Sequence, residues 1–164
     1  MKKILTICLA VVLGAATVSA KEYKYSLGVV GGLGLGAQFK TMVTDNFTII
    51  EEFGYFTCIS NAAYAGAIDN LVLAYQTKPL ASGQGIDLKV YTGGQIKLGY
   101  SGNAGFDAGL FGFGAAAGIE ANMKNAPIAF SFDFRPGYAF QFNGGGAGAH
   151  MFDYSFNLGV RYTF

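Results

Sequence analysis

Acidic and basic side chains recur at alternate positions in parts of this 164-residue chain. Asp133 and Arg135 are the clearest pair, because residues two apart in an extended segment point to the same side. Glu120 precedes them across one predicted turn, and Arg161 lies close to the C-terminus. If the fold encloses these side chains together, opposite charges can form ion pairs, since a buried ion requires a partner. The alternative is a narrow ion path that opens when those pairs rearrange.

His150 suggests a hydrolytic site, because it is the only histidine and lies near Asp153 and Ser155 in the sequence. Such a site requires serine, histidine and acid to orient one another through hydrogen bonds. Ser155 is five positions from His150, which is about 16 Å along an extended strand. We therefore expect a rim or loop histidine, no enzyme activity and no cofactor. Cys58 is the only cysteine after residue 20, which excludes an intramolecular disulfide in the chain after that point and a cysteine-rich metal site.

The segments that carry these residues alternate between apolar side chains and small or polar ones. In residues 152–164 every even position is Phe, Tyr, Leu or Val, and every odd position is polar or glycine. Alternation of this kind predicts a β-strand with one apolar face. Turns at 41–45, 78–85 and 124–127, and loops at 58–66, 101–105 and 143–149, separate the runs. The predicted strands are 23–29 and 33–40, divided at Val30-Gly31-Gly32, then 47–56, 70–76, 86–100, 111–123, 128–138 and 152–164.

Two places depart from ideal strand chemistry. Glu51 and Glu52 are adjacent, so both can avoid the apolar face only through a bulge or an interfacial position. We assign Glu52 to the polar face and leave the facing of Glu51 open. Pro136 lacks the N–H that a strand would donate, which predicts a bulge or kink at Pro136-Gly137 near the outer rim.

The contents of the two faces indicate that the apolar face points outward. One face is aromatic and aliphatic, which suits lipid, while the other is glycine-rich with charges of both signs, which suits a small closed interior. Spanning strands must close into a barrel, because no water satisfies an open edge in hydrocarbon. Single-chain bacterial barrels have an even strand count. We therefore predict an all-β, eight-stranded antiparallel up-and-down transmembrane β-barrel, with an aromatic girdle that includes Tyr25, Tyr100, Tyr138 and Tyr162.

The composition agrees with this class. The chain is 52% hydrophobic and only 13% charged, with 25 glycines, whereas soluble domains average about 25% charged residues and about 7% glycine. A net charge of +1 offers no basic patch for nucleic acid. Lys2 and Lys3 precede an apolar segment and Val18-Ser19-Ala20. This order predicts a secretory signal peptide over residues 1–20, cleaved after Ala20, and one barrel domain over residues 21–164.

The segment 21–164 resembles the small outer-membrane β-barrel family, the porin family of OmpA/OmpX-like transmembrane barrels, in the form common in Bacteroidota. GLGAQFK at 34–40, APIAFSFDFRPGY at 126–138 and NLGVRYTF at 157–164 carry the resemblance. It implies an integral protein of the bacterial outer membrane in contact with its lipid. In this family a C-terminal strand that ends on an aromatic residue is the signal for the outer-membrane assembly machinery, so the resemblance assigns Tyr162 and Phe164 to that role.

Two functions stay open at this point. The first is a monomeric protein of structural, envelope-maintenance or surface-interaction type, with short loops and a packed polar interior. The second is a gated narrow channel for ions or small solutes, which the resemblance to OmpA-type barrels permits; a wide pore is excluded because eight strands leave room only for side chains. The residues assigned to the interior charge network, or to the gate in the second case, are Glu52, Lys89, Lys97, Glu120, Asp133, Arg135 and Arg161.

Overall fold

The computed structural model describes residues 23–164 except positions 33, 58–64, 84, 104–105 and 144–145. The predicted signal peptide with Ala20, and Cys58, lie outside the described residues. Within the part of the chain that is described, no helix is long and apolar enough to cross a membrane.

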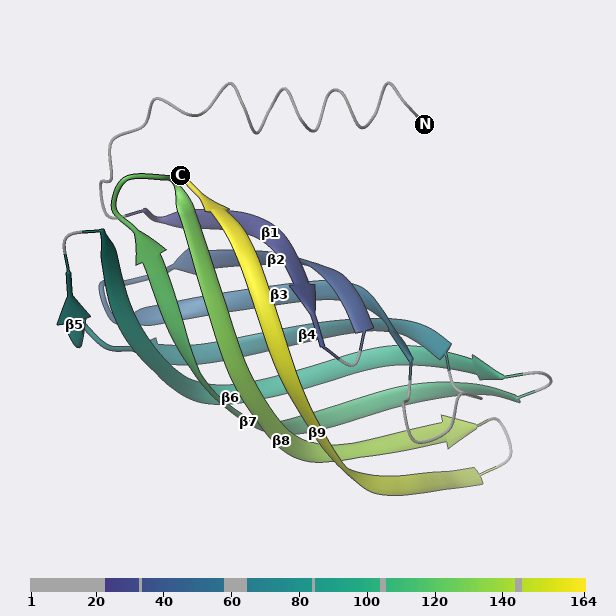
Figure 1. Ribbon diagram of the computed structural model, residues 1–164. Coiled ribbons are helices and arrows are strands. Elements are labelled where there is room, and N and C mark those ends of the chain that lie inside the picture. Colours follow the sequence, from purple (N-terminus) through teal and green to yellow (C-terminus); the bar gives the residue numbers. More distant parts are fainter. Residues whose placement is uncertain (1–22, 33, 58–64, 84, 104–105, 144–145) are drawn as a thin grey trace, which may run out of the picture.

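Eight long strands form one antiparallel sheet that closes on itself (Figure 1). Each long strand pairs with the next along the chain, β4 pairs with β6, and β1 pairs with β9 to complete the ring. The predicted eight-stranded barrel is confirmed, as is the division of the first run into a hairpin. The strands are β1 Tyr25–Gly31, β2 Gly34–Met42, β3 Phe47–Thr57, β4 Ala65–Gln76, β6 Ile86–Asn103, β7 Phe106–Met123, β8 Ile128–Asn143 and β9 Gly146–Thr163, with a two-residue β5 at Ala81–Ser82 beside β6.

The strands end at unequal levels at one end of the barrel. We call the end at which β1 begins and β9 finishes the terminal end; the turns around 43–46, 77–85 and 124–127 lie there too. At the opposite end, the far end, strands β6 to β9 extend well beyond the short β1–β2 hairpin (Figure 1).

The strands at the far end are longer than the sequence predicts. Asn143 pairs with Gly146 and Asn103 pairs with Phe106, so most of the predicted loops at 101–105 and 143–149 is strand. His150, which we expected at the rim or in a loop, lies within β9 opposite Phe140 and near the far end, so it is not a loop residue. Glycine and asparagine resemble loop residues in a sequence, yet a hairpin can extend through them because ladder bonds involve only the backbone.

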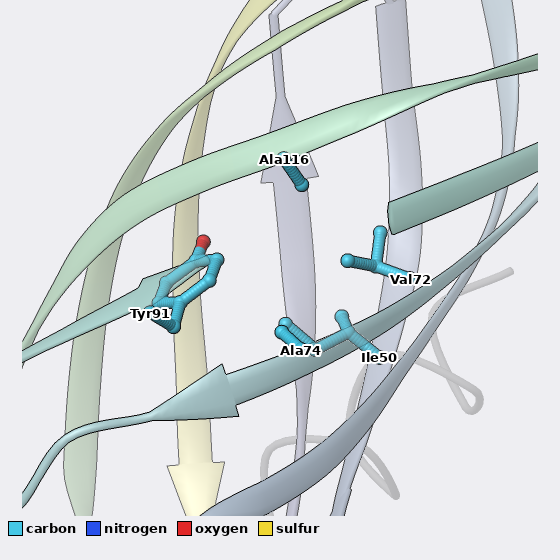
Figure 2. Packing of buried hydrophobic residues seen from close by; sticks show 5 residues of the cluster. All are labelled: Ile50, Val72, Ala74, Tyr91 and Ala116. Carbon is cyan, nitrogen blue, oxygen red and sulfur yellow. The ribbon is translucent and has the colours of Figure 1, made fainter. Parts of the chain in front are cut away.

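The closed sheet sorts side chains as the alternation predicts. Outward positions hold exposed apolar residues such as Leu35, Phe53 and Leu158, whereas inward positions hold buried polar ones such as Gln38 and Lys40. The interior also contains an apolar cluster on the side of β3, β4, β6 and β7. Figure 2 shows its members, which are Ile50, Val72, Ala74, Tyr91 and Ala116.

The structure resolves the facing of the adjacent glutamates. Glu52 is buried in the interior and Glu51 is exposed on the outer face. The registers of β3 with β2 and β4 run through both residues without a shift, so β3 has no bulge there. One carboxylate therefore lies on an otherwise apolar part of the outer surface, beside Phe39 and Leu71 on the neighbouring strands.

Pro136 lies in the middle of β8, so the predicted bulge near the rim is wrong. The Thr163 N–H on β9 donates to the Pro127 carbonyl at 2.9 Å, so the backbone groups of odd-numbered residues in this part of the chain face β9. Because the direction of these groups alternates along a strand, the backbone groups of even-numbered residues of β8 face β7. The β7–β8 ladder is interrupted between Gly114↔Gly137 and Ala117↔Phe134, with the same register on both sides. Pro136 therefore removes a ladder bond without adding a residue. The register shift of β8 occurs between Phe140 and Phe142.

Replacing Pro136 with valine should restore that bond. We expect the free energy of unfolding of Pro136→Val to rise by about 1 kcal/mol, the net contribution of one hydrogen bond. Urea unfolding in detergent micelles measures this value. The control is Ile128→Val, which changes an outward side chain of β8 and no hydrogen bond. A Pro136→Val protein of unchanged or lower stability would show that the missing N–H does not limit this ladder.

Candidate functional site in the barrel interior

Arg135 and Asp133 on β8 form an ion cluster with Glu52 on β3. Arg135 donates from Nε to Asp133 Oδ1 at 2.7 Å and from Nη2 to Glu52 Oε1 at 2.6 Å, and its Nη1 bonds the second oxygen of Glu52. The planar guanidinium thus holds two carboxylates, one from its own strand and one from a strand far away in the sequence. We call these three residues the central ion cluster.

Neutral side chains satisfy the remaining oxygens of the central ion cluster. Asn70 donates to Glu52 at 3.1 Å, and Asn157 donates to Asp133 at 2.9 Å. The Tyr91 hydroxyl, which belongs to the apolar cluster of Figure 2, donates to the other oxygen of Asp133 at 2.5 Å. A buried ion pair is tolerated only when such bonds complete its shell, so these three residues are part of the same site.

Glu120 on β7 is the centre of a second group nearer the terminal end. Lys40 Nζ lies 2.7 Å from Glu120 Oε2, Arg161 pairs with the same oxygen, and all three side chains are 0% exposed. Gln76 accepts from Lys40 at 2.9 Å and donates to Glu120 Oε1 at 2.8 Å. We call Lys40, Glu120 and Arg161 the terminal ion cluster.

Tyr23, which precedes β1 in the chain, contacts the terminal ion cluster. Its hydroxyl donates to Glu120, and the Nζ atoms of Lys40 and Lys89 lie 5.8 and 5.9 Å from its ring centre. Burial, followed by the Glu120 carboxylate, raises the pKa of the Tyr23 phenol well above its ordinary value of 10. Tyr23 therefore stays a neutral hydrogen-bond donor at any physiological pH.

Gln38 joins the two clusters into one network. Its amide donates to Glu52 in the central ion cluster and accepts from Arg161 in the terminal ion cluster. The joined clusters contain three cations and three anions, so the described network is electrically neutral. This neutrality is what permits six charges in an interior that water hardly reaches.

Glycines make room for the longest members. A Cβ atom at Gly159 would lie 2.5 Å from Ser131 Oγ and 2.9 Å from Gln38 Oε1, and Ser131 accepts from Arg161 at 3.1 Å. Two strands away, on β7, a Cβ at Gly118 would lie 2.7 Å from the Tyr91 ring. The inward-facing glycines therefore provide the volume that the arginine and tyrosine side chains occupy.

The seven residues predicted for the network do not all meet. The structure brings together Glu52, Glu120, Asp133, Arg135 and Arg161. Lys97 instead pairs with Asp153 nearer the far end, and Lys89 lies beside Tyr23 at the terminal end.

Sequence reasoning missed Lys40, Gln38 and Tyr23. Gln38 and Lys40 lie at even positions of the run 33–40, and the even positions form the polar face of that run. Position and polarity together were therefore sufficient to predict that both side chains point inward. The direction of the Tyr23 side chain is predicted wrongly by the alternation, because its odd position assigns it to the apolar outer face. It precedes the first residue of β1, so the alternation of that strand does not determine its direction.

Some interior polar atoms have no hydrogen-bond partner in the described structure. Both amide atoms of Gln95, Oδ1 of Asn70 and Nε of Arg161 belong to this group. Ser155 is buried and accepts from Asn157 at 3.1 Å, while the side chain of His150 lies outside the described residues. The described residues contain no group of three or more His, Cys, Asp or Glu side chains arranged to hold a metal ion.

Comparisons with known proteins show the fold. No protein-family model matches the chain, and no curated protein matches it. The N-terminal β-barrel domain of Pseudomonas aeruginosa OprF is similar with a TM-score of 0.50 and 15% identity, covering 85% of this chain and 96% of that domain. A major outer membrane protein from Thermus thermophilus has a TM-score of 0.50 and 12% identity, covering 88% of this chain and 100% of that one. The chain therefore shares its barrel architecture with these two solved structures.

Removing the charge of Glu120 should destabilise the barrel strongly. Glu120→Gln leaves Lys40 and Arg161 as buried cations without their shared carboxylate, and breaking a buried pair costs about 3–5 kcal/mol. The matched control is Glu51→Gln, which makes the same atomic change on the outer surface. Urea unfolding of both variants in the same detergent measures the difference. Equal stability of the two would mean that the terminal ion cluster does not hold the interior together.

Proposed function

We propose that this chain is an integral β-barrel protein of the bacterial outer membrane, of the OmpA/OmpX-like type, with a closed interior and a structural or surface-interaction role. One observation carries the proposal: the barrel is apolar outside and charged inside. Outward side chains such as Leu27, Phe132 and Phe156 are each more than a third exposed, while the ions lie within. In water this arrangement is unfavourable, whereas in a bilayer the same face is solvated by lipid.

The orientation in the membrane follows from the end at which the strands extend furthest. Barrels of this class have their longer extensions on the extracellular side. At the far end β6 to β9 extend well beyond the β1–β2 hairpin, whereas the terminal end has the first residue of β1 and the last residue of β9. Tyr25 and Tyr162 near this end, and Tyr100 and Tyr138 toward the far end, suit the two interfacial aromatic belts. We therefore assign the terminal end to the periplasm and the far end to the cell surface.

The C-terminal residue has the exposure that an assembly signal requires. Phe164 is more than half exposed, and its backbone exchanges two hydrogen bonds with Tyr25 at 2.9 and 3.0 Å. Its ring stacks with Tyr162 at 6.2 Å. These contacts support the proposal that the assembly machinery recognises Tyr162 and Phe164 on the strand that later closes the ring with β1.

Two leucines of equal exposure test the location of the bilayer. Leu158 lies on the outer face of β9 and is 65% exposed, while Leu80 lies in a turn at the terminal end and is 66% exposed. We expect Leu158→Arg to lose about 2–4 kcal/mol of folding free energy in phospholipid vesicles, and Leu80→Arg to lose about 0–1 kcal/mol. Folding is followed by the heat-modifiable gel mobility of the barrel. Equal losses, or a wild-type chain whose mobility is not heat-modifiable, would contradict membrane insertion.

A narrow channel is the second candidate, and one feature favours it. Arg135 bonds both Glu52 and Asp133, so its guanidinium can exchange carboxylates while staying paired. Within the described part of the chain, the amide of Gln95 and Nε of Arg161 have no hydrogen-bond partner, and polar interior positions of this kind suit water. In the closed arrangement the paired side chains fill the interior, as eight strands require.

Conductance in planar bilayers separates the two candidates. For the closed interior we expect no stable conductance steps from the wild-type protein, because every cluster charge is paired. Stable wild-type steps whose size changes in Arg135→Ala would favour the channel instead. The control is Lys124→Ala, which removes a surface ion pair with Asp87 at the terminal end and should leave any current unchanged.

A further inference from the structure

Two carboxylates lie on the outer wall of the barrel, on the neighbouring strands β3 and β4 (Figure 1). They belong to Glu51 and Asp69, and both side chains are exposed at outward positions of their strands. Glu51 is paired with Leu71, and Phe53 with Asp69, so the two acidic residues are diagonal neighbours. Their Cβ atoms are therefore about 7 Å apart. We call Glu51 and Asp69 the wall acids.

Apolar side chains surround the wall acids. Phe39 on β2 is paired with Glu51, and Leu98 on β6 is paired with Asp69. Phe53, which is two residues from Glu51 on the same strand, is 65% exposed. Among the described residues, no side chain forms a hydrogen bond or an ion pair with either wall acid. Two unpaired carboxylates thus lie on a surface that is otherwise hydrocarbon.

The depth of the wall acids rests on the proposed membrane location. Phe47 and Tyr75 pair near the terminal end, and their exposed rings suit the aromatic belt of that interface. Glu51 is four residues from Phe47, which is about 13 Å along the strand and about 10 Å along the axis at a tilt of about 40°. Asp69 is six residues from Tyr75, which is about 20 Å along the strand and about 15 Å along the axis. Both wall acids therefore lie within the apolar band, which is about 25 Å tall.

An unpaired carboxylate at this depth is unfavourable, because lipid offers neither water nor a counter-charge. Ionisable side chains inside membranes are rare, and they pair with an opposite charge or with polar backbone groups. The wall acids therefore call for a cation, which this chain, a second copy, a lipid or a different protein must supply.

This chain places no cation beside the wall acids. Its described lysines and arginines are in the interior (Lys40, Lys97, Arg135 and Arg161) or at the terminal end (Lys24, Lys78, Lys89 and Lys124). Positions 33, 58–64, 84, 104–105 and 144–145 contain no basic residue, and Lys2 and Lys3 belong to the predicted signal peptide. Lys21 is two residues from Tyr23, at most about 7 Å of chain. Asp69 is on the third strand around the wall from β1, about 14 Å away, and lies higher as well.

A second copy and a lipid are also poor sources of the cation. The described outward positions between the two aromatic belts include the wall acids but no lysine or arginine. Two copies that met through this wall would place carboxylates against each other or against hydrocarbon, and both arrangements are unfavourable. The ammonium group of a lipid stays at the interface, above or below the wall acids. Charge complementarity therefore favours a different membrane protein.

We propose that the wall acids and their apolar surroundings are the docking surface for a different integral membrane protein, whose lipid-facing wall carries an arginine at the matching depth. A guanidinium can bond two carboxylates at once, as Arg135 does inside the barrel. The partner's side chains around that arginine must be apolar, so that they pack on Phe39, Phe53 and Leu98 and keep the ion pair from lipid and water. This arrangement, an ion pair within an apolar ring, is typical of the most stabilising contacts of an interface.

The experiment measures association of a defined membrane peptide with the mature protein in phosphatidylcholine vesicles. The probe is a helix of leucine and alanine with tryptophan at both ends, one central arginine and an acceptor dye. Its control peptide has glutamine in place of the arginine. The donor dye is attached to Cys58, the only cysteine after residue 20, and energy transfer reports association. The protein variants are Glu51→Gln, Asp69→Asn and the two combined, with Asp45→Asn in an exposed terminal-end turn as the matched control.

We expect the wild-type and Asp45→Asn proteins to bind the arginine peptide about tenfold more tightly than the glutamine peptide, which corresponds to about 1.4 kcal/mol. Each single wall-acid variant should lower this preference, and the double variant should abolish it. Equal binding of the two peptides by the wild type, or a preference that survives in the double variant, would overturn the proposal. The heat-modifiable gel band of each variant shows separately whether the membrane barrel has formed.

The other sources of the cation give different results. A wild-type dimer that the double variant abolishes would assign the wall to a second copy. Loss of the preference when phosphatidylethanolamine replaces phosphatidylcholine would assign it to a lipid headgroup. Tighter binding of the arginine peptide by Lys21→Gln would assign it to the N-terminal segment of this chain. Each of these three results would overturn the proposal.

A second measurement needs no partner. In the isolated barrel the wall acids face lipid, so Asp69→Asn should raise the equilibrium constant for folding into the same vesicles by about tenfold, which corresponds to about 1.4 kcal/mol. Asp45→Asn makes the same atomic change outside the apolar band and should leave the constant unchanged. Equal constants for Asp69→Asn and the wild type would show that this carboxylate is not unpaired in lipid, and the proposal would be wrong.

Discussion

The structure depends on the hydrogen bonds that join β1 to β9. They connect the first and last strands, and only through them does the sheet acquire an inside and an outside. An open sheet with the same sequence would expose its charges on one face and its aromatic rings on the other, with two unpaired edges. Closure converts the simple alternation of the strands into an interior of paired ions and an outer wall of apolar side chains.

Closure also determines what the interior must contain. Eight strands enclose a space that side chains fill, so each ion placed there needs a partner within reach. Gln38 on β2 and Arg161 on β9 are far apart in the sequence, yet the ring brings them together and Gln38 links the two ion clusters. Buried ion pairs add little net stability, but they oppose strand slippage: a shift of one residue would move Asp133 to the apolar face. The network is therefore better understood as a determinant of register.

The sequence predicts the strands and their faces because both depend on parity, which is local. Asp133 and Arg135 are on one side of β8 for that reason alone. The partners across the barrel depend on register between distant strands and on side-chain reach, so Lys97 was grouped with the network although it meets Asp153. Tyr23 escaped prediction because it lies before its strand. The extension of β9 through His150 escaped prediction because ladder pairing continues through glycine-rich residues. These are properties of the tertiary structure, and no local pattern encodes them.

The length mismatch at the closing pair links the two main features of the molecule. β1 has seven residues and β9 has eighteen, so the same pairing that seals the terminal end must stop short of the far end. Beyond Gly31, the pairing of β9 that the described residues show is its ladder with β8. The β1–β9 pairing thus encloses the terminal end, where Lys40, Glu120 and Arg161 are buried, while the long hairpins of β6 to β9 form the far end.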